Sequence, residues 1–161
     1  MVLGMSTFTF VHIVLSLIGI FSGFVVVYGL FAADRLNGWT ALFLLTTVLT
    51  SVTGFFFPFH KFLPSHGVGT MSLIVLAVAI FARYMRHLTG AWRRIYVITA
   101  VIALYLNVFV LVAQLFMKIP ALKAMAPTGS ESPFLVSQIV VMALFVVVTI
   151  IAAKRFPIDP V

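Results

Sequence analysis

The chain has 161 residues, 63% of them hydrophobic and 8% charged, whereas a soluble domain is about 45–50% apolar and about 25% charged. This composition excludes an ordinary soluble protein and indicates a membrane protein. Ten Lys and Arg residues against three acids give a formal net charge of +7, but no basic stripe suited to nucleic acid lies outside the apolar runs, and the absence of cysteine excludes disulfides and thiolate metal sites.

Five apolar runs follow one another, each near the roughly 20 residues that a helix needs to cross a bilayer. They predict one all-α membrane domain over residues 1–161, because backbone groups in lipid must be satisfied within their own segment. The predicted spans are 7–32, 39–59, 67–85, 95–118 and 134–153. The first run is longer than the roughly 7–15 apolar residues of a cleavable signal, so we expect it to remain as a span.

The basic residues divide unevenly between the two sides that five spans define. Seven fall on one side: Arg35, Arg83, Arg86, Arg93, Arg94, Lys154 and Arg155. Three fall on the other: Lys61, Lys118 and Lys123. Because basic residues concentrate in cytoplasmic loops, this division predicts an outside amino terminus and a cytoplasmic carboxyl terminus.

Several stretches resemble a group of small bacterial polytopic inner-membrane proteins with no assigned activity. They are the stretch from Thr50 to His60 (TSVTGFFFPFH), the tripeptide 64–66 (PSH), the stretch from Leu104 to Phe109 (LYLNVF) and the stretch from Pro120 to Lys123 (PALK). The resemblance implies a multi-pass protein of the bacterial inner membrane, and it carries no ligand or catalytic residue.

Polar residues occur at a similar depth in three predicted spans, near the ends that we expect outside. His12 and Ser16 recur on one face of the first span with Gly19 and Gly23. One face of the fourth span carries Asn107, Gln114 and Lys118, and Gln138 lies about one turn into the fifth span. Polar side chains in membranes turn toward the bundle interior or a wet cavity, so we expect a polar cluster of Ser16, Asn107, Gln114, Gln138 and Lys118.

Three histidines are candidate cofactor ligands on this side of the membrane. His12 with His60 or His66 offers imidazole nitrogens to a b-type haem or a transition metal. The alternative is structural, with His12 hydrogen-bonded to Gln114 or Gln138 and the two loop histidines solvated.

The opposite side presents a group of arginines, Arg83, Arg86, Arg93 and Arg94. We expect these arginines to meet anionic lipid headgroups.

No protease, hydrolase or phosphate-loop motif is present, so an enzymatic activity is uncertain and no catalytic residue is assigned. The three acids lie outside the spans, which disfavours a proton-coupled or cation-coupled pump. We expect first an accessory or assembly subunit of a larger membrane complex or homo-oligomer. The alternatives are a histidine-ligated redox protein and a small-solute transporter or sensor.

Overall fold

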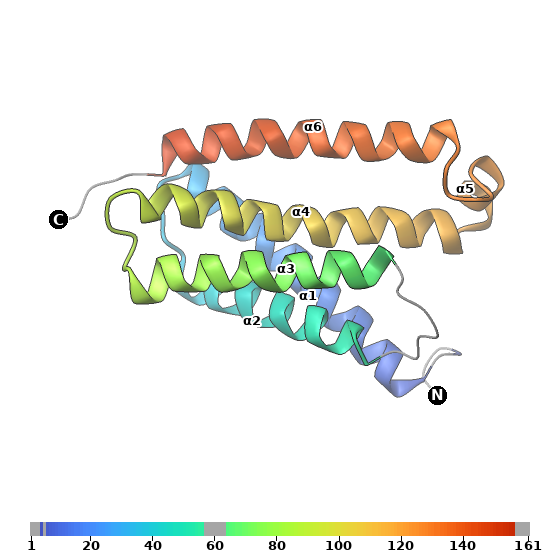
Figure 1. Ribbon diagram of the computed structural model, residues 1–161, viewed down its shortest axis with the longest axis horizontal. Coiled ribbons are helices and arrows are strands. Elements are labelled where there is room, and N and C mark those ends of the chain that lie inside the picture. Colours follow the sequence, from blue (N-terminus) through green and yellow to red (C-terminus); the bar gives the residue numbers. More distant parts are fainter. Residues whose placement is uncertain (1–3, 5, 57–63, 157–161) are drawn as a thin grey trace.

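The computed structural model describes residues 4, 6–56 and 64–156, and in them the chain forms a bundle of long antiparallel helices (Figure 1). In chain order the elements are α1 (Thr7–Phe31), α2 (Asn37–Gly54), α3 (Pro64–Ile80), the π-helical turn η1 (Phe81–Met85), α4 (Trp92–Lys118), α5 (Pro120–Met125) and α6 (Ser132–Arg155). These described residues contain no strand, and the predicted all-α fold is confirmed.

Four segments are long and apolar enough to cross a membrane, and they lie close to four of the predicted spans. They are Thr7–Phe31, Gly67–Met85, Trp92–Lys118 and Ser132–Arg155. The predicted span 39–59 corresponds to α2, which is not one of the four and ends earlier, at Gly54. A polar first turn and several hydroxyl side chains lower the hydropathy of this helix.

Two local features were not predicted. The connector between the fourth and fifth spans contains a helix of its own, α5, which starts with Pro120 at its first position, where a missing N–H costs nothing. The carboxyl end of α3 changes to π-helix over residues 81–85, a form that often marks functional or strained positions.

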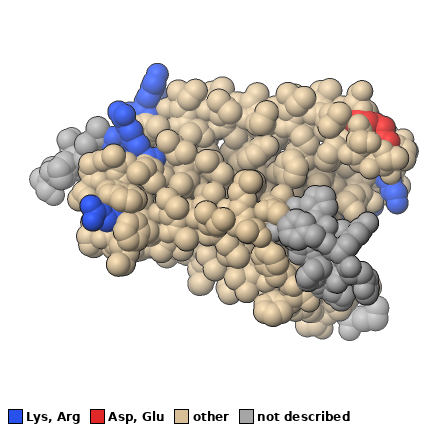
Figure 2. Space-filling model, in the orientation of Figure 1, with Lys and Arg blue, Asp and Glu red and all other residues tan. Residues whose placement is uncertain are grey.

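The loops gather at two ends of the bundle (Figure 1). We call the end that carries α5 and the first residues of α1 the α5 end. The other, where α1 ends and α4 begins, is the arginine end. Lys and Arg side chains gather there, at the left of the space-filling view (Figure 2).

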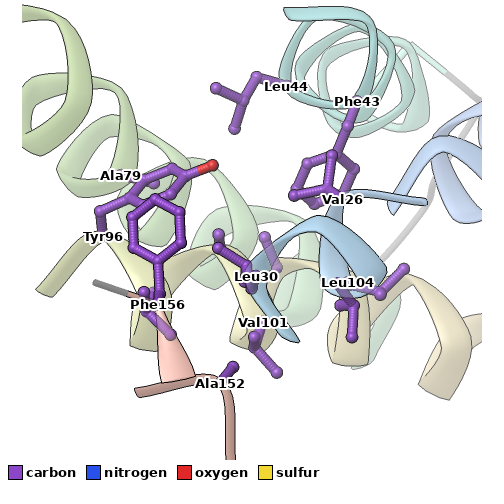
Figure 3. Close-up of a cluster of buried hydrophobic side chains, with 14 of the residues drawn as sticks. Val26, Leu30, Phe43, Leu44, Ala79, Tyr96, Val101, Leu104, Ala152 and Phe156 are labelled. Atoms are coloured by element: carbon purple, nitrogen blue, oxygen red, sulfur yellow. The ribbon is translucent and has the colours of Figure 1, made fainter. Parts of the chain in front are cut away.

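The apolar core lies mainly in the half of the bundle nearer the arginine end (Figure 3). Val26 and Leu30 of α1 pack there with Phe43 of α2 and with Val101 and Leu104 of α4. α1 approaches these neighbours closely through Gly23, where an added Cβ would lie 2.6 Å from Leu104 Cδ1 and 3.0 Å from Phe43 Cε1. The glycine face predicted from the sequence is therefore a contact between helices.

α6 lies at the edge of the bundle, where it contacts α4 and α1. Aromatic pairs join it to α4, with ring centroids 5.5 Å apart for both Tyr105–Phe145 and Phe116–Phe134. Only 6% of the residues in its most apolar stretch are buried, so most of its aliphatic surface faces the surroundings of the protein.

Candidate functional site: a cavity in the α5 half

The α5 half of the bundle is open where the other half is packed. None of the buried residues of α1 precedes Gly19, and in α4 only Phe116 is buried beyond Leu106. Between the amino-terminal half of α1 and the carboxyl-terminal half of α4 lies a cavity of about 510 Å³, which α2 and α3 also line. This volume is within the range of about 300–1,000 Å³ that holds small organic ligands.

Small side chains create this space. α2 and α3 contribute Ser51, Gly54, Gly69 and Ser72 to the wall, and α1 contributes Ser16. None of these side chains reaches far from its helix, so the four helices surround a volume that larger residues would fill.

The structure brings most of the predicted polar residues together around this cavity. His12, Ser16, Asn107, Gln114 and Lys118 all line it. Lys118 follows Asn107 by eleven positions along α4, which corresponds to a depth of roughly 16 Å at about 1.5 Å per residue.

His12 is hydrogen-bonded to α2 at the wall of the cavity. Its Nδ1 lies 2.7 Å from the Thr53 hydroxyl oxygen, and that hydroxyl donates its own hydrogen to the Leu49 carbonyl oxygen at 2.7 Å. Thr53 therefore accepts at His12, which makes Nδ1 a protonated nitrogen of the ring. Gly54 lies against the ring, because a Cβ there would be in ordinary van der Waals contact, 3.6 Å from His12 Cε1.

The deeper polar groups of the cavity wall are bonded to the protein itself. Ser16 donates to the Ile13 carbonyl oxygen at 2.8 Å, and Thr50 donates to that of Thr46 at 2.7 Å. The Ser51 hydroxyl donates to Ser72 at 3.1 Å. The hydrogens of Ser16, Thr50 and Ser51 are therefore already used, whereas Ser72 accepts a bond and Asn107 donates one, from Nδ2 to Thr47 Oγ1 at 3.4 Å.

The outer part of the α4 face is different. Neither the Gln114 amide nor the Lys118 ammonium has a hydrogen-bond partner within the described part of the chain, and both side chains are exposed. An amide and an ammonium that can still donate to a ligand therefore lie toward the α5 end of the cavity.

The other predicted site residues lie elsewhere or outside the described residues. Gln138 is buried between α6 and α4, where its Nε2 donates to the Phe109 carbonyl oxygen at 3.2 Å, and it does not line the cavity. His66 lies in the first turn of α3, and His60 lies outside the described residues. Sequence reasoning missed Gly54 as a lining residue, although it stands in the run TSVTG, which ends α2.

The structure divides the four arginines of the arginine end into two pairs. Arg86 and Arg94 are exposed, whereas Arg83 and Arg93 are only 7% and 4% exposed. Arg83 donates from Nη2 to the Arg35 carbonyl oxygen at 3.0 Å and to Asn37 Oδ1 at 2.6 Å. The surface available to lipid headgroups is therefore smaller than the sequence suggested.

No group of three or more His, Cys, Asp or Glu side chains that could hold a metal ion occurs in residues 4, 6–56 and 64–156. Comparisons with protein-family models, with curated proteins and with solved structures found no match. The cavity and its lining residues are therefore the basis for a functional proposal.

Proposed function

We propose that this chain is a multi-pass membrane protein that binds a small organic molecule within its α5 half, as a carrier, a sensor or a ligand-binding subunit. The observation that carries the proposal is the cavity of about 510 Å³, lined by aliphatic side chains and by His12, Gln114 and Lys118. A largely apolar space with a few convergent polar groups is the usual form of a small-molecule site.

Filling the cavity tests this proposal. Ser16→Trp places a large side chain in the cavity, while Val14→Trp adds the same side chain to an exposed position two residues away on α1. Native mass spectrometry of gently purified protein should show one bound small molecule in the wild type and in Val14→Trp, and none in Ser16→Trp. An unliganded wild type, or equal retention in both variants, would overturn the proposal.

The geometry of His12 favours a second candidate, a b-type haem or a metal in the same cavity. Metal-ligating histidines generally donate their other ring N–H to a protein oxygen, which fixes the ring and its tautomer. His12 has this arrangement through Thr53. His60 and His66 are the proposed second ligands.

An absorption spectrum and a metal analysis of the wild type test this second candidate. A haem or metal held by His12 should be lost in His12→Ala and retained in His87→Ala, since His87 lies in the loop at the arginine end. A colourless wild type without bound metal would exclude it and leave the organic ligand.

We further propose five membrane crossings in a bacterial inner membrane, with the α5 end outside. α2 supports this number, because its 18 residues reach about 27 Å at about 1.5 Å per residue and it runs antiparallel beside α1 (Figure 1). The predicted role as an accessory or assembly subunit stays a prediction. The exposed aliphatic surface of α6 is compatible with lipid as well as with a partner helix.

A further inference from the structure

Both ionisable side chains that line the cavity lie toward its α5 end. Lys118 and His12 are the only Lys, Arg, His, Asp or Glu residues among the described residues that line it. Both are basic residues, and both lie in the part of the cavity nearest the α5 end. The described acids do not line the cavity, since Asp34 follows α1 and Glu131 precedes α6.

Unmet hydrogen-bonding capacity is found at the same end. Gln114 and Lys118 lie four residues apart, one above the other on the same face of α4. They offer amide and ammonium donors for which the described part of the chain provides no acceptor. Deeper in the cavity, Ser16, Thr50 and Ser51 already donate to protein oxygens, and Asn107 donates to Thr47 Oγ1, so among the described residues no cation and no amide without a partner lies there.

Below this level the cavity is lined largely by hydrocarbon. α1 contributes Ile13, Leu17 and Ile20, and α4 contributes Val110 and Leu111. An apolar chain that enters this part gains the hydrophobic contacts of four helices and meets few polar groups that need a new partner.

The geometry points to an acyl chain with an anionic headgroup as the ligand of this cavity, with the headgroup at Lys118 and Gln114 and the chain directed toward Ile20. This inference rests on the proposed function and adds the ligand class. A carboxylate or phosphate oxygen accepts from both donors, and the cation disfavours a positively charged ligand. In the proposed topology, this orientation is also that of an amphipath in the outer leaflet.

Paired ligands and a matched variant test the charge requirement. The probes are palmitate and hexadecanol, which share a chain length and differ in the headgroup. Lys118→Gln removes the ammonium from the cavity, and Lys123→Gln removes one from the exposed surface of α5 as a control. Binding is measured by native mass spectrometry on detergent-solubilised, delipidated protein whose thermal stability matches that of the wild type.

Wild type and Lys123→Gln should bind palmitate about ten-fold more tightly than hexadecanol, as expected for one partly exposed charge-assisted hydrogen bond. In Lys118→Gln this preference should vanish, with hexadecanol binding unchanged, and Lys118→Arg should restore it. Phosphatidylglycerol, tested in parallel, distinguishes the two sources of the headgroup. Tighter binding than palmitate with the same Lys118 dependence assigns a phospholipid, and the reverse order assigns a free carboxylate.

The failures of the two proposals are distinguishable. Equal affinity for palmitate and hexadecanol, or a palmitate preference that survives in Lys118→Gln, overturns the anionic ligand. If hexadecanol is then still excluded by Ser16→Trp, ligand binding in the cavity stands. If neither amphipath binds the wild type, both proposals are wrong.

Discussion

Arg83 shows how a single side chain joins the helices at the arginine end. Its guanidinium donates to Arg35 in the α1–α2 loop and to Asn37 at the start of α2, and it lies over the Tyr96 ring of α4, whose centroid is 5.1 Å from Cζ. The backbone of the same loop is strained, because Leu36 has a positive φ of 41°. A buried charge with hydrogen bonds and a ring face stabilises a loop that would otherwise relax.

Replacement of Arg83 should therefore destabilise the protein, whereas an exposed neighbour should not. We expect Arg83→Gln to lower the free energy of unfolding by about 2–3 kcal/mol. The substitution removes hydrogen bonds from a charged donor and leaves their acceptors without a partner. Arg94→Gln, at an exposed position of α4, should change it by less than about 0.5 kcal/mol. Thermal unfolding in detergent measures both variants. Equal midpoints would show that the Arg83 contacts contribute nothing to stability.

Glu131 organises the loop that leads into α6, and it lies outside the membrane-spanning segments. Its carboxylate accepts from the Thr128 hydroxyl at 2.6 Å and from the Thr128 and Ser130 amides. These bonds, led by the Thr128 hydroxyl, hold the pKa of Glu131 below its ordinary value.

The loop should consequently be ordered at neutral pH and loosen in acid. A lowered folded-state pKa gives a contribution that is complete above the unfolded pKa and is lost as pH falls through the folded one. A carbon-detected NMR titration of Glu131 should give a midpoint below that of a model peptide, and Thr128→Val should raise it. A midpoint at or above the peptide value would contradict this reading.

At the scale of the helices, Gly23 decides how closely α1 approaches α2 and α4. The small-residue face of α1 allows its backbone to approach the side chains of neighbouring helices. Such close packing matters in a membrane, because the hydrophobic effect does not drive helices together in lipid. Gly19 packs in the same way, since a Cβ there would lie 3.2 Å from Thr47 Oγ1. Toward its amino terminus the same helix has no buried residue before Gly19 and lines the cavity instead.

A methyl group at this contact should be costly. Gly23→Ala would place Cβ 2.6 Å from Leu104 Cδ1 in the packed core, so we expect a loss of about 1–3 kcal/mol. Gly38→Ala is the control, because no heavy atom lies within 4 Å of its added Cβ and helix propensity favours Ala by about 0.8–1.0 kcal/mol. An unfolding midpoint that falls in Gly38→Ala and not in Gly23→Ala would show that Gly23 does not form a close helix contact.

For the whole molecule, the number of crossings and their direction are linked. Five crossings place the two termini on opposite sides, whereas four would place them on the same side. A fluorescent protein that matures only in the cytoplasm, fused after Val161, should be fluorescent. An amino-terminal tag should be accessible to a protease added outside spheroplasts. If both termini report the same side, α2 does not cross.

The sequence by itself determined the class of protein, the all-α fold and the approximate limits of four spanning segments. Continuous apolar runs in lipid leave the backbone no alternative to helix, so these features follow from local sequence. Helical periodicity also placed His12 with Ser16, and Asn107 with Gln114 and Lys118, because residues on one helical face are set by spacing alone.

Only the tertiary structure decided which faces meet and where they separate. The sequence could not show that Gln138 bonds to Phe109 while Gln114 faces a cavity, because the rotation of one helix about another depends on the packing of all of them. Arg83 and Arg93 likewise read as headgroup ligands at the end of a span, yet both side chains are buried, and Arg83 is bonded to Arg35 and Asn37. The cavity itself lies where small side chains of four helices face one another, on the amino-terminal side of the Gly23 contact of α1, and no single helix shows that they meet.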